Sequence, residues 1–358
     1  MTTDRRRVLT IVGARPQFVK AFPVSRRLKG AHDEVLVHTG QHYDDELSGV
    51  FFDELDLPVP AYNLGVGSAP HPVQVARMMT ELNDVFEAEA PDAALVYGDT
   101  NSTLAGALVA SMRSTPLVHV EAGLRSGDWE MPEERNRVMA DHLADVCCAP
   151  CERAVETLRG EGIDEGVWNT GDVMYDALVD VRERAIEVAT VRVDLGLRPG
   201  EYVLATVHRA ANTGDPDRLE EILAGLADAP YPVVFPVHPR TEAALREYGL
   251  WERATEALTV IEPVGYLEFV DLLDGAARVA TDSGGVQKEA LFLGTVCVTL
   301  REETEWIETV EAGWNTLVGA SADAIRAALA ERRVPSSSPD PYGDGDAAAR
   351  IVEALADA

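Results

Sequence analysis

Three carboxylates stand where an α/β protein would place catalytic groups. Asp99 and Glu121 each follow a short apolar run, in the segments YGDTNST and HVEAG, and Glu133 follows Pro132 at a predicted helix start. Neighbouring carboxylates in different protonation states can serve as acid and base. His208 follows another apolar run, and a histidine there can carry a proton or bind a phosphate oxygen. Any one of these residues could be a cap or a satisfied polar group, but together they predict a catalytic site.

The segment GARPQFVK is a candidate anion site. It places Gly13, Arg15 and Lys20 directly after an apolar run, before helix-compatible sequence. A glycine turn at a helix start offers free N–H groups and the positive end of the helix dipole. The segment contains neither the dinucleotide fingerprint nor the phosphate loop. A plain turn with surface cations is therefore an equally acceptable interpretation.

The segment TDSGGVQKEA is a stronger candidate. Ser283, Gly284 and Gly285 would let the backbone of a helix start approach a diphosphate closely, because glycine has no Cβ. Glu289 follows about one turn later and could accept hydrogen bonds from ribose hydroxyls. The alternative is an ordinary capped helix start. One such cradle in each half of the chain predicts a nucleotide diphosphate that spans both halves.

The elements that would position these residues form two series. Apolar runs alternate with helix-like stretches, which predicts the α/β class with doubly wound parallel sheets. We expect two Rossmann-like domains facing a cleft, with ligands beyond the carboxyl ends of the strands. The predicted strands are 8–13, 34–40, 93–99, 116–123 and 145–150, then 202–209, 231–239, 258–265, 277–285 and 295–302. The predicted domains are 1–172 and 173–342, followed by a C-terminal helix within 343–358 that packs back toward the first domain.

The charge balance is unusual for an α/β protein. The chain of 358 residues has 61 acidic and 31 basic residues, a net charge of -30. Such a surface repels nucleic acids and anionic membranes, so neither is an expected partner. Its lysines are Lys20, Lys29 and Lys288, and the other basic residues are arginines. This composition favours adaptation to a high-salt cytoplasm, and the alternative is an acidic protein from an organism with GC-rich codons.

Other compositional signals are weaker. Cys147, Cys148 and Cys151 are clustered and Cys297 is distant, and no second pair follows at a zinc-site spacing. We therefore expect buried thiols and no metal. The chain contains no uninterrupted apolar stretch of about 20 residues and no secretion signal, which predicts a cytoplasmic protein.

Ten segments together resemble one enzyme family. They are GARPQFVKA, HTGQHYD, YGDTNST, HVEAGLRS, MPEERNR, GDVMYDAL, HRAANT, TDSGGVQKEA, REETEW and PYGDG. In order and spacing, over about residues 8–353, the chain resembles the non-hydrolysing UDP-N-acetylglucosamine 2-epimerases. The resemblance implies a fold like that of the B-type glycosyltransferases, a UDP-binding C-terminal domain, a homodimer, and no redox cofactor or metal. It also implies an isomerase reaction in which UDP is eliminated to give a 2-acetamidoglycal and then re-added.

The resemblance also implies residue roles. Asp99, Glu121 and Glu133 match the family's catalytic acids, and His208 matches its catalytic or phosphate-contacting histidine. Arg15, Lys20, Arg137, Ser283, Gly284 and Gly285 match the family's substrate and diphosphate contacts. We add His238 and Arg301 as further expected substrate contacts. Phe269 matches the position that packs on uracil, and Glu289 matches the ribose contact.

The chain departs from the family pattern near the site. It has Lys288 in QKE where bacterial members commonly have QEE, and HRAAN where they have HRRE. Bacterial members bind a second UDP-N-acetylglucosamine as an activator. Gln41, Arg209 and His238 match part of that activator site, but the segment GVGSAPHPVQVA contains no arginine. The resemblance therefore covers the activator site only in part.

Other functions remain open at this stage. The segments GARPQF, QHYD and EAGLRS are also similar to the branch that epimerises UDP-2,3-diacetamido-glucuronic acid. A B-fold glycosyltransferase would share the nucleotide cradle, but it would not need three acids. A nucleotide-sugar sensor would have lost some of the four candidate catalytic residues, and a hydrolysing relative often carries a fused kinase domain.

The charge pattern generates a first prediction. On dialysis from molar KCl into dilute buffer, we expect the protein to unfold, because self-repulsion of a net charge of -30 is then unscreened. Circular dichroism at successive salt concentrations measures this. A protein that stays folded throughout would support the alternative of an acidic protein from an ordinary cytoplasm.

Overall fold

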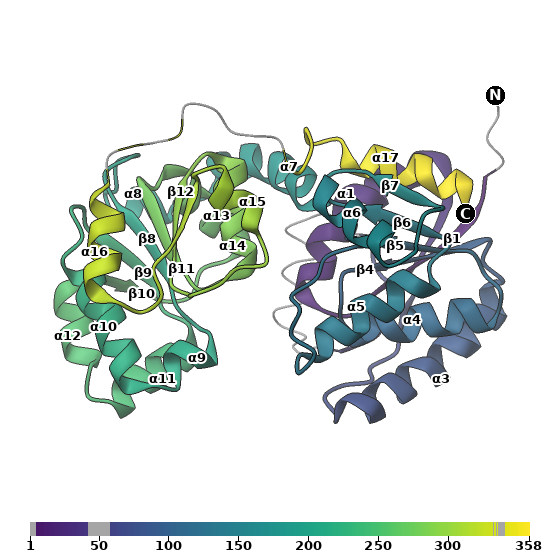
Figure 1. The fold of residues 1–358 in the computed structure, drawn as a ribbon, viewed down its shortest axis with the longest axis horizontal. Coiled ribbons are helices and arrows are strands. Elements are labelled where there is room, and N and C mark those ends of the chain that lie inside the picture. Colours follow the sequence, from purple (N-terminus) through teal and green to yellow (C-terminus); the bar gives the residue numbers. More distant parts are fainter. Residues whose placement is uncertain (1–4, 42–57, 332, 334, 336–340) are drawn as a thin grey trace. The chain divides into compact units, whose positions relative to one another are not determined.

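The chain folds into two compact units that each contain a parallel sheet (Figure 1). A computed structural model describes residues 5–41, 58–331, 333, 335 and 341–358. Unit 1 comprises Met1–Asp180 and Asp340–Ala358, and unit 2 comprises Val181–Pro339. The predicted α/β class with two doubly wound sheets is confirmed.

The sheet of unit 1 has the strand order β3-β2-β1-β4-β5-β6-β7, and its neighbouring strands run parallel. The order changes direction between β1 and β4, and such a switch point is where open α/β sheets bind ligands. The strands are β1 (Arg7–Val12), β2 (Asp33–His38), β3 (Tyr62–Asn63), β4 (Ala93–Tyr97), β5 (Leu117–Val120), β6 (Val146–Ala149) and β7 (Val167–Asn169).

Helices cover both faces of this sheet (Figure 1). The helices are α1 (Arg15–Ala31), α3 (His71–Glu89), α4 (Asn101–Met112), α5 (Pro132–Leu143), α6 (Glu152–Gly160), α7 (Val173–Val188) and α17 (Ala347–Ala354), with a 3-10 turn at Leu355–Asp357. In α3, Met78, Leu82 and Val85 recur at helical spacing and are buried, so this face packs on the sheet. α3, α4 and α5 lie on one face, and α1 lies on the other with α17 packed against it.

The units divide within α7, between Asp180 and Val181, rather than at 172/173 as the sequence suggested. The reason is that α7 is continuous from Val173 to Val188, so its first half packs with unit 1. α17 also belongs to unit 1.

The sheet of unit 2 has the order β10-β9-β8-β11-β12-β13 and is also parallel. Its strands are β8 (Val203–Thr206), β9 (Val233–Pro236), β10 (Thr259–Ile261), β11 (Arg278–Thr281), β12 (Val296–Thr299) and β13 (Asn315–Leu317). Its helices are α8 (Val191–Asp194), α9 (Ala210–Thr213), α10 (Pro216–Ala227), α11 (Pro239–Glu247), α12 (Trp251–Ala257), α13 (Tyr266–Gly275), α14 (Gly284–Leu293), α15 (Ile307–Glu311) and α16 (Ala322–Ala330).

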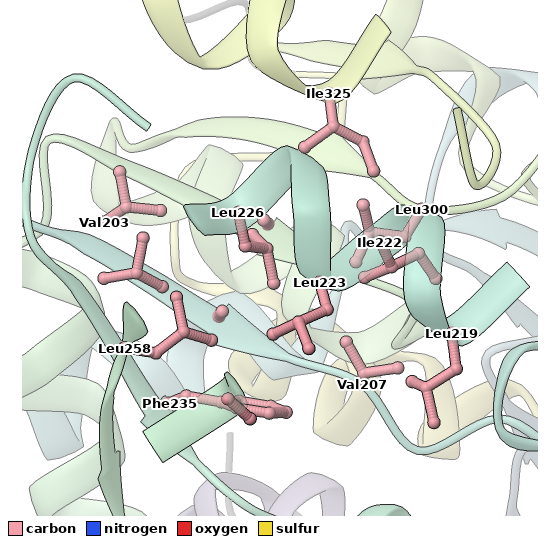
Figure 2. Packing of buried hydrophobic residues seen from close by; sticks show 14 of the residues in the cluster. Val203, Val207, Leu219, Ile222, Leu223, Leu226, Phe235, Leu258, Leu300 and Ile325 are labelled. Atoms are coloured by element: carbon pink, nitrogen blue, oxygen red, sulfur yellow. The ribbon is translucent and has the colours of Figure 1, made fainter. Parts of the chain in front are cut away.

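Helix α10 carries the core on one face of this sheet. Its apolar residues at spacings of three and four lie over the strands (Figure 2). Gly225 lets α16 pack close to α10, because a Cβ there would lie 2.7 Å from the Cβ of Ile325. The α10 residues in this core are Leu219, Ile222, Leu223 and Leu226.

The strands are shorter than the apolar runs that predicted them. The run 116–123 contains β5 only from Leu117 to Val120, because Glu121 turns the backbone out of the extended conformation. Strands β3, β7 and β13 were not predicted, since each has only two or three residues and no continuous apolar run.

Within the described ranges, no helix has the length and apolar character that crossing a membrane requires. The same ranges contain no group of three His, Cys, Asp or Glu side chains arranged to hold a metal ion. All four cysteines are buried, and burial raises the pKa of the Cys148 and Cys297 thiols to about 12, so these two remain protonated at neutral pH.

The attachment of α17 to unit 1 generates a second prediction. Asp176, on α7, accepts hydrogen bonds from the first N–H groups of α17, at Ala347 (3.0 Å) and Ala348 (2.7 Å). Replacing a capping aspartate with alanine costs about 0.5 to 2 kcal/mol of stability. We expect D176A to lower the Tm by about 1 to 8 °C in calorimetry.

The matched control is D180A on the same helix. Asp180 pairs with Arg26 at 2.8 Å, and both side chains are exposed. Such surface pairs contribute about 0 to 1 kcal/mol to the free energy of unfolding, so we expect D180A to lower the Tm less than D176A does. Equal losses of Tm in the two variants would contradict the capping role of Asp176.

Candidate active site

Asp99 and Glu121 lie at the same edge of the unit 1 sheet. Glu121 follows β5 directly, and Asp99 follows β4 by two residues. β4 and β5 are hydrogen-bonded parallel neighbours. Beyond β4, the N–H of Gly98 donates to the carbonyl of Val120 at 2.9 Å, which extends the pairing by one bond. The structure therefore places these two carboxylates on adjacent strand ends.

Glu121 forms an ion pair with Lys20 of α1. The Lys20 Nζ lies 2.6 Å from Oε1 of Glu121, and both side chains are only about a tenth exposed. The pair lies against the backbone of Gly98, because a Cβ there would be 3.1 Å from Lys20 Nζ and 3.5 Å from Glu121 Oε1. The glutamate and the lysine are thus held beside the residue that precedes Asp99.

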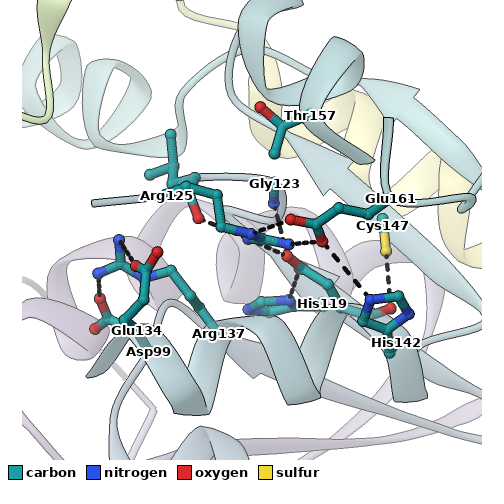
Figure 3. A network of polar contacts seen from close by, with 12 residues as sticks. Asp99, His119, Gly123, Arg125, Glu134, Arg137, His142, Cys147, Thr157 and Glu161 are labelled. Carbon is teal, nitrogen blue, oxygen red and sulfur yellow. Dashed lines mark hydrogen bonds and ion pairs between the residues drawn. The ribbon is translucent and has the colours of Figure 1, made fainter. Parts of the chain in front are cut away.

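Asp99 forms its own ion pair, with Arg137 of α5 (Figure 3). Arg137 also lies 3.3 Å from Glu134. Glu134 accepts hydrogen bonds from the N–H groups of Ser126 and Gly127, both at 2.9 Å. Burial alone would raise the pKa of Glu134, but these bonds and the charge of Arg137 lower it. Each strand-end carboxylate therefore has a separate cation.

Helix α5 also fixes the backbone at Asp99. The side-chain amide of Asn136 donates to the carbonyl of Asp99 at 3.0 Å and to Oδ1 of Asn101 at 3.1 Å. Glu134 and Asn136 were missed at the sequence level. The signal was the helical spacing in EERNR, which places Glu134 and Arg137 on one face.

The backbone at Glu121 is strained. Its φ of 69° lies in the left-handed region, which costs a residue with a Cβ about 1 to 2 kcal/mol. The N–H groups of Glu121 and Ala122 both donate to the carbonyl of Cys148, at 3.1 Å each, and this holds the turn. Strain of this kind persists where the surroundings enforce it, and it is concentrated at functional sites.

The first candidate anion site is the turn at Gly13. The sequence allowed either free N–H groups or a plain turn here, and the N–H groups of Gly13 and Ala14 both donate to Oε1 of Gln17, at 2.8 and 3.1 Å. Lys20 is paired with Glu121, and the side chain of Arg15 lies outside the described residues. The bonds to Gln17 leave these two N–H groups unavailable to an anion in this conformation.

Glu133 is the second residue of α5, as its position after Pro132 predicted. Its side chain is partly exposed, whereas that of the adjacent Glu134 is buried. The catalytic role of Glu133 remains a prediction.

In unit 2, His208 follows β8 and lies beside a buried aspartate. Nδ1 of His208 is 3.3 Å from Oδ1 of Asp282. The same Oδ1 accepts from the backbone N–H of His208, and Oδ2 of Asp282 accepts from the backbone N–H of Arg209. The ring of His238 lies 5.7 Å from that of His208, centre to centre. Burial, the nearby His208 and Arg240 lower the pKa of His238. Sequence reasoning missed Asp282 because a strand-end aspartate before a glycine turn looks like an ordinary cap.

The start of α14 is the predicted diphosphate cradle. Ser283 is its N-cap residue but forms no side-chain capping bond. A Cβ on Gly284 would lie 3.4 Å from Nε1 of Trp306 and 3.9 Å from Nη2 of Arg209. On Gly285, the neighbour that a Cβ would meet among the described residues is the Ser283 side chain, at 4.0 Å. The Gly284 Cβ position also lies 3.8 Å from Oε2 of Glu305, so the helix start faces an arginine together with a carboxylate.

Glu305 was not predicted at this cradle. It accepts from Arg301 at 3.0 Å and lies 3.9 Å from Arg209. Burial would raise the pKa of Glu305, but the arginines lower it, so it is a carboxylate that occupies both cations. Nearby, Lys288 Nζ lies 3.9 Å from the ring centre of Trp306.

The predicted nucleoside contacts lie on α13 and α14. Tyr266 donates to Oε1 of Glu289 at 3.1 Å, and both side chains are buried. Phe269 is partly buried and packs at the edge of the core of this face.

The predicted activator residues lie in both units. Oε1 of Gln41, in unit 1, accepts from the N–H (3.0 Å) and the hydroxyl (2.8 Å) of Ser102, whereas Arg209 and His238 belong to unit 2.

Comparison with known proteins identifies the family. Residues 26–356 match the family model described as UDP-N-acetylglucosamine 2-epimerase. The chain belongs to the UDP-N-acetylglucosamine 2-epimerase family. A Methanococcus maripaludis UDP-N-acetylglucosamine 2-epimerase homolog is 46% identical, over 98% of this chain and 99% of the relative. A Pseudomonas aeruginosa UDP-2,3-diacetamido-2,3-dideoxy-D-glucuronate 2-epimerase is 44% identical, with the same coverage.

Solved structures of UDP-N-acetylglucosamine 2-epimerases have the same fold. The Methanocaldococcus jannaschii enzyme, in complex with UDP-GlcNAc and UDP, has a TM-score of 0.86 at 40% identity, with 98% of this chain and 99% of that chain covered. A Phytolacca americana protein complexed with UDP-2fluoro-glucose shares the fold alone, at a TM-score of 0.64 and 11% identity. These likenesses agree with the predicted B-type glycosyltransferase fold.

The closeness of Gly98 to the Lys20–Glu121 pair generates a third prediction for this epimerase family member. G98A would place a Cβ 3.1 Å from Lys20 Nζ at a φ of 61°. We expect the displaced pair to reduce kcat at least about tenfold, because small misplacements of reacting groups are costly. Steady-state kinetics with a UDP-sugar measures this.

The control is G65A. Gly65 has a similar φ of 58°, but a Cβ there would have no atom of the described residues within 4 Å. G65A therefore introduces the same backbone strain as G98A without a contact to the Lys20–Glu121 pair. If both variants lost activity equally, strain alone would explain the effect and the contact would not.

Proposed function

We propose that the protein interconverts UDP-N-acetylglucosamine and UDP-N-acetylmannosamine by epimerisation at C2. The observation that carries this proposal is the pair of carboxylates on adjacent strand ends, Asp99 with Arg137 and Glu121 with Lys20. Epimerisation requires one group to remove the C2 proton and another to return it on the opposite face. Two positioned carboxylates meet that requirement, in a family named for this reaction.

In the proposed reaction, a carboxylate removes the C2 proton while the C1–O bond to UDP breaks. The C–H electron pair forms the C1=C2 double bond of a 2-acetamidoglycal, and the C1–O pair leaves with the diphosphate. A carboxyl group then protonates C2 from the other face, and UDP re-adds at C1. Asp99 and Glu121 share these transfers with Glu133, and the oxidation state is unchanged, so the chemistry needs no redox cofactor.

Departure of UDP requires positive groups for its charge. We assign this role to the start of α14 at Ser283, Gly284 and Gly285, with His208 and Arg301. Glu289, held by Tyr266, is suited to accept the ribose hydroxyls, and Phe269 to pack on uracil. Arg15, Lys20, Arg137 and His238 are the remaining proposed substrate contacts.

A second substrate has specific support. The relative from Pseudomonas aeruginosa, at 44% identity, is named for UDP-2,3-diacetamido-2,3-dideoxy-D-glucuronate. That sugar carries a C6 carboxylate, which would require a cation. Among the described residues of the unit 1 network, Lys20, Arg125 and Arg137 each already have a carboxylate partner. Because Lys20 and Arg137 are also proposed substrate contacts, their pairing does not decide between the two sugars.

We further propose that the protein is a homodimer that works in a high-salt cytoplasm and supplies polysaccharide synthesis. The net charge of -30 and the three lysines support the salt adaptation. We also propose a UDP-binding role for unit 2, since it carries the α14 cradle. Gln41, Arg209 and His238 remain the candidates for an activator site.

Proton NMR in D2O tests the reaction directly. With UDP-N-acetylglucosamine in molar KCl, we expect UDP-N-acetylmannosamine to form with deuterium at C2 of both epimers. The inactive control is D99N, which keeps the size of the side chain but removes the base. Absence of both exchange and product with the wild-type protein would overturn this substrate, and exchange with UDP-2,3-diacetamido-glucuronic acid alone would establish the second one.

A further inference from the structure

A buried histidine lies behind the two strand-end carboxylates. His119 is in β5, two residues before Glu121, and its side chain is fully buried. Its Nε2 lies 2.7 Å from the carbonyl oxygen of Gly98, and its Nδ1 lies 2.7 Å from Oδ1 of Asp141 on α5. Both ring nitrogens therefore face oxygen atoms.

These contacts fix where the protons lie. A carbonyl oxygen only accepts, so Nε2 of His119 must donate to Gly98. Oδ2 of Asp141 accepts from Arg125 at 2.7 Å and from the N–H of Gly123 at 3.1 Å, which stabilises the ionised carboxylate. Burial raises the pKa of Asp141, but His119 and Arg125 outweigh it and lower the pKa. With Asp141 ionised, Nδ1 must also donate, and a histidine that donates from both nitrogens is an imidazolium.

The His119–Asp141 pair contacts the chain on both sides of Glu121 and directly before Asp99. His119 and Gly123 are two residues before and after Glu121, and both bond to Asp141. Gly98, which accepts the bond from His119, precedes Asp99. The contacts are therefore suited to hold Glu121 in its left-handed conformation and to fix the turn that carries Asp99.

We propose that His119, as an imidazolium, and Asp141 are positioning residues that set the two proton-transferring carboxylates relative to each other. The proposal rests on the proposed C2 epimerisation. It assigns His119 and Asp141 no contact with substrate, since neither is exposed. Their effect is on the placement of Asp99 and Glu121 and therefore on the rate of proton transfer.

The test compares two variants of the full chain that each remove one acidic partner of Arg125. D141N keeps the shape but removes the charge that stabilises the imidazolium, whereas E161Q removes the outer partner, which lies 2.6 Å from Arg125 and does not contact His119. We expect D141N to reduce kcat for C2 deuterium exchange by about 10- to 100-fold with KM within about twofold. E161Q should stay within about twofold in both constants.

UDP binding, measured by calorimetry, and circular dichroism control for folding. If D141N binds UDP like the wild type and loses only kcat, the positioning role is supported. If kcat is retained, or KM and UDP binding weaken as much as kcat falls, the role is overturned.

Nitrogen NMR of histidine-labelled protein provides a readout that does not need catalysis. We expect both ring nitrogens of His119, assigned with H119Q, to be protonated in the wild type at neutral pH, and this signature to be lost in D141N. A neutral tautomer in the wild type would overturn the proposal even if the enzyme is active. A protonated ring in a protein that shows no exchange with either sugar would instead locate the failure in the proposed function.

Discussion

The left-handed backbone of Glu121 is the constraint on which the unit 1 site depends. It ends β5 after Val120 and turns the carboxylate toward Lys20, instead of leaving it to alternate along the strand. The conformation costs about 1 to 2 kcal/mol, so it requires fixed partners on both sides. The carbonyl of Cys148, in β6, accepts the N–H groups of Glu121 and Ala122, and Asp141, in α5, accepts the N–H of Gly123. The conformation of Glu121 therefore depends on both β6 and α5.

Charge is balanced locally at this site although the chain as a whole is strongly acidic. Asp99, Glu121 and Asp141 are paired with Arg137, Lys20 and Arg125, respectively. Without these cations, carboxylates on neighbouring strand ends would repel one another and take up protons. The sequence argument assumed neighbouring carboxylates in different protonation states, but the structure places a cation beside each of these three acids. Arg137 is shared with Glu134, and Arg125 is shared with Glu161.

The sequence predicted the parts of the site that depend on strand ends, and it missed those that depend on side-chain direction. Asp99 and Glu121 could be placed because parallel strands share one carboxyl edge. The sequence left open whether the turn at Gly13 is an anion site or a plain turn, since nothing in the sequence shows that Gln17 bends back to bond the N–H groups of Gly13 and Ala14. Glu305 was missed for the same reason, because its two arginines are distant from each other in the chain.

The few lysines of the chain lie mostly in its interior. Of the three lysines, Lys20 and Lys288 are buried and only Lys29 is exposed. A bias caused only by codon usage would remove lysines from the interior and the surface alike. Here lysine persists where an ammonium group has a specific partner, the Glu121 carboxylate or the Trp306 ring, and it is almost absent from the surface. The proposed adaptation to salt would produce this pattern, because it acts on the solvated surface.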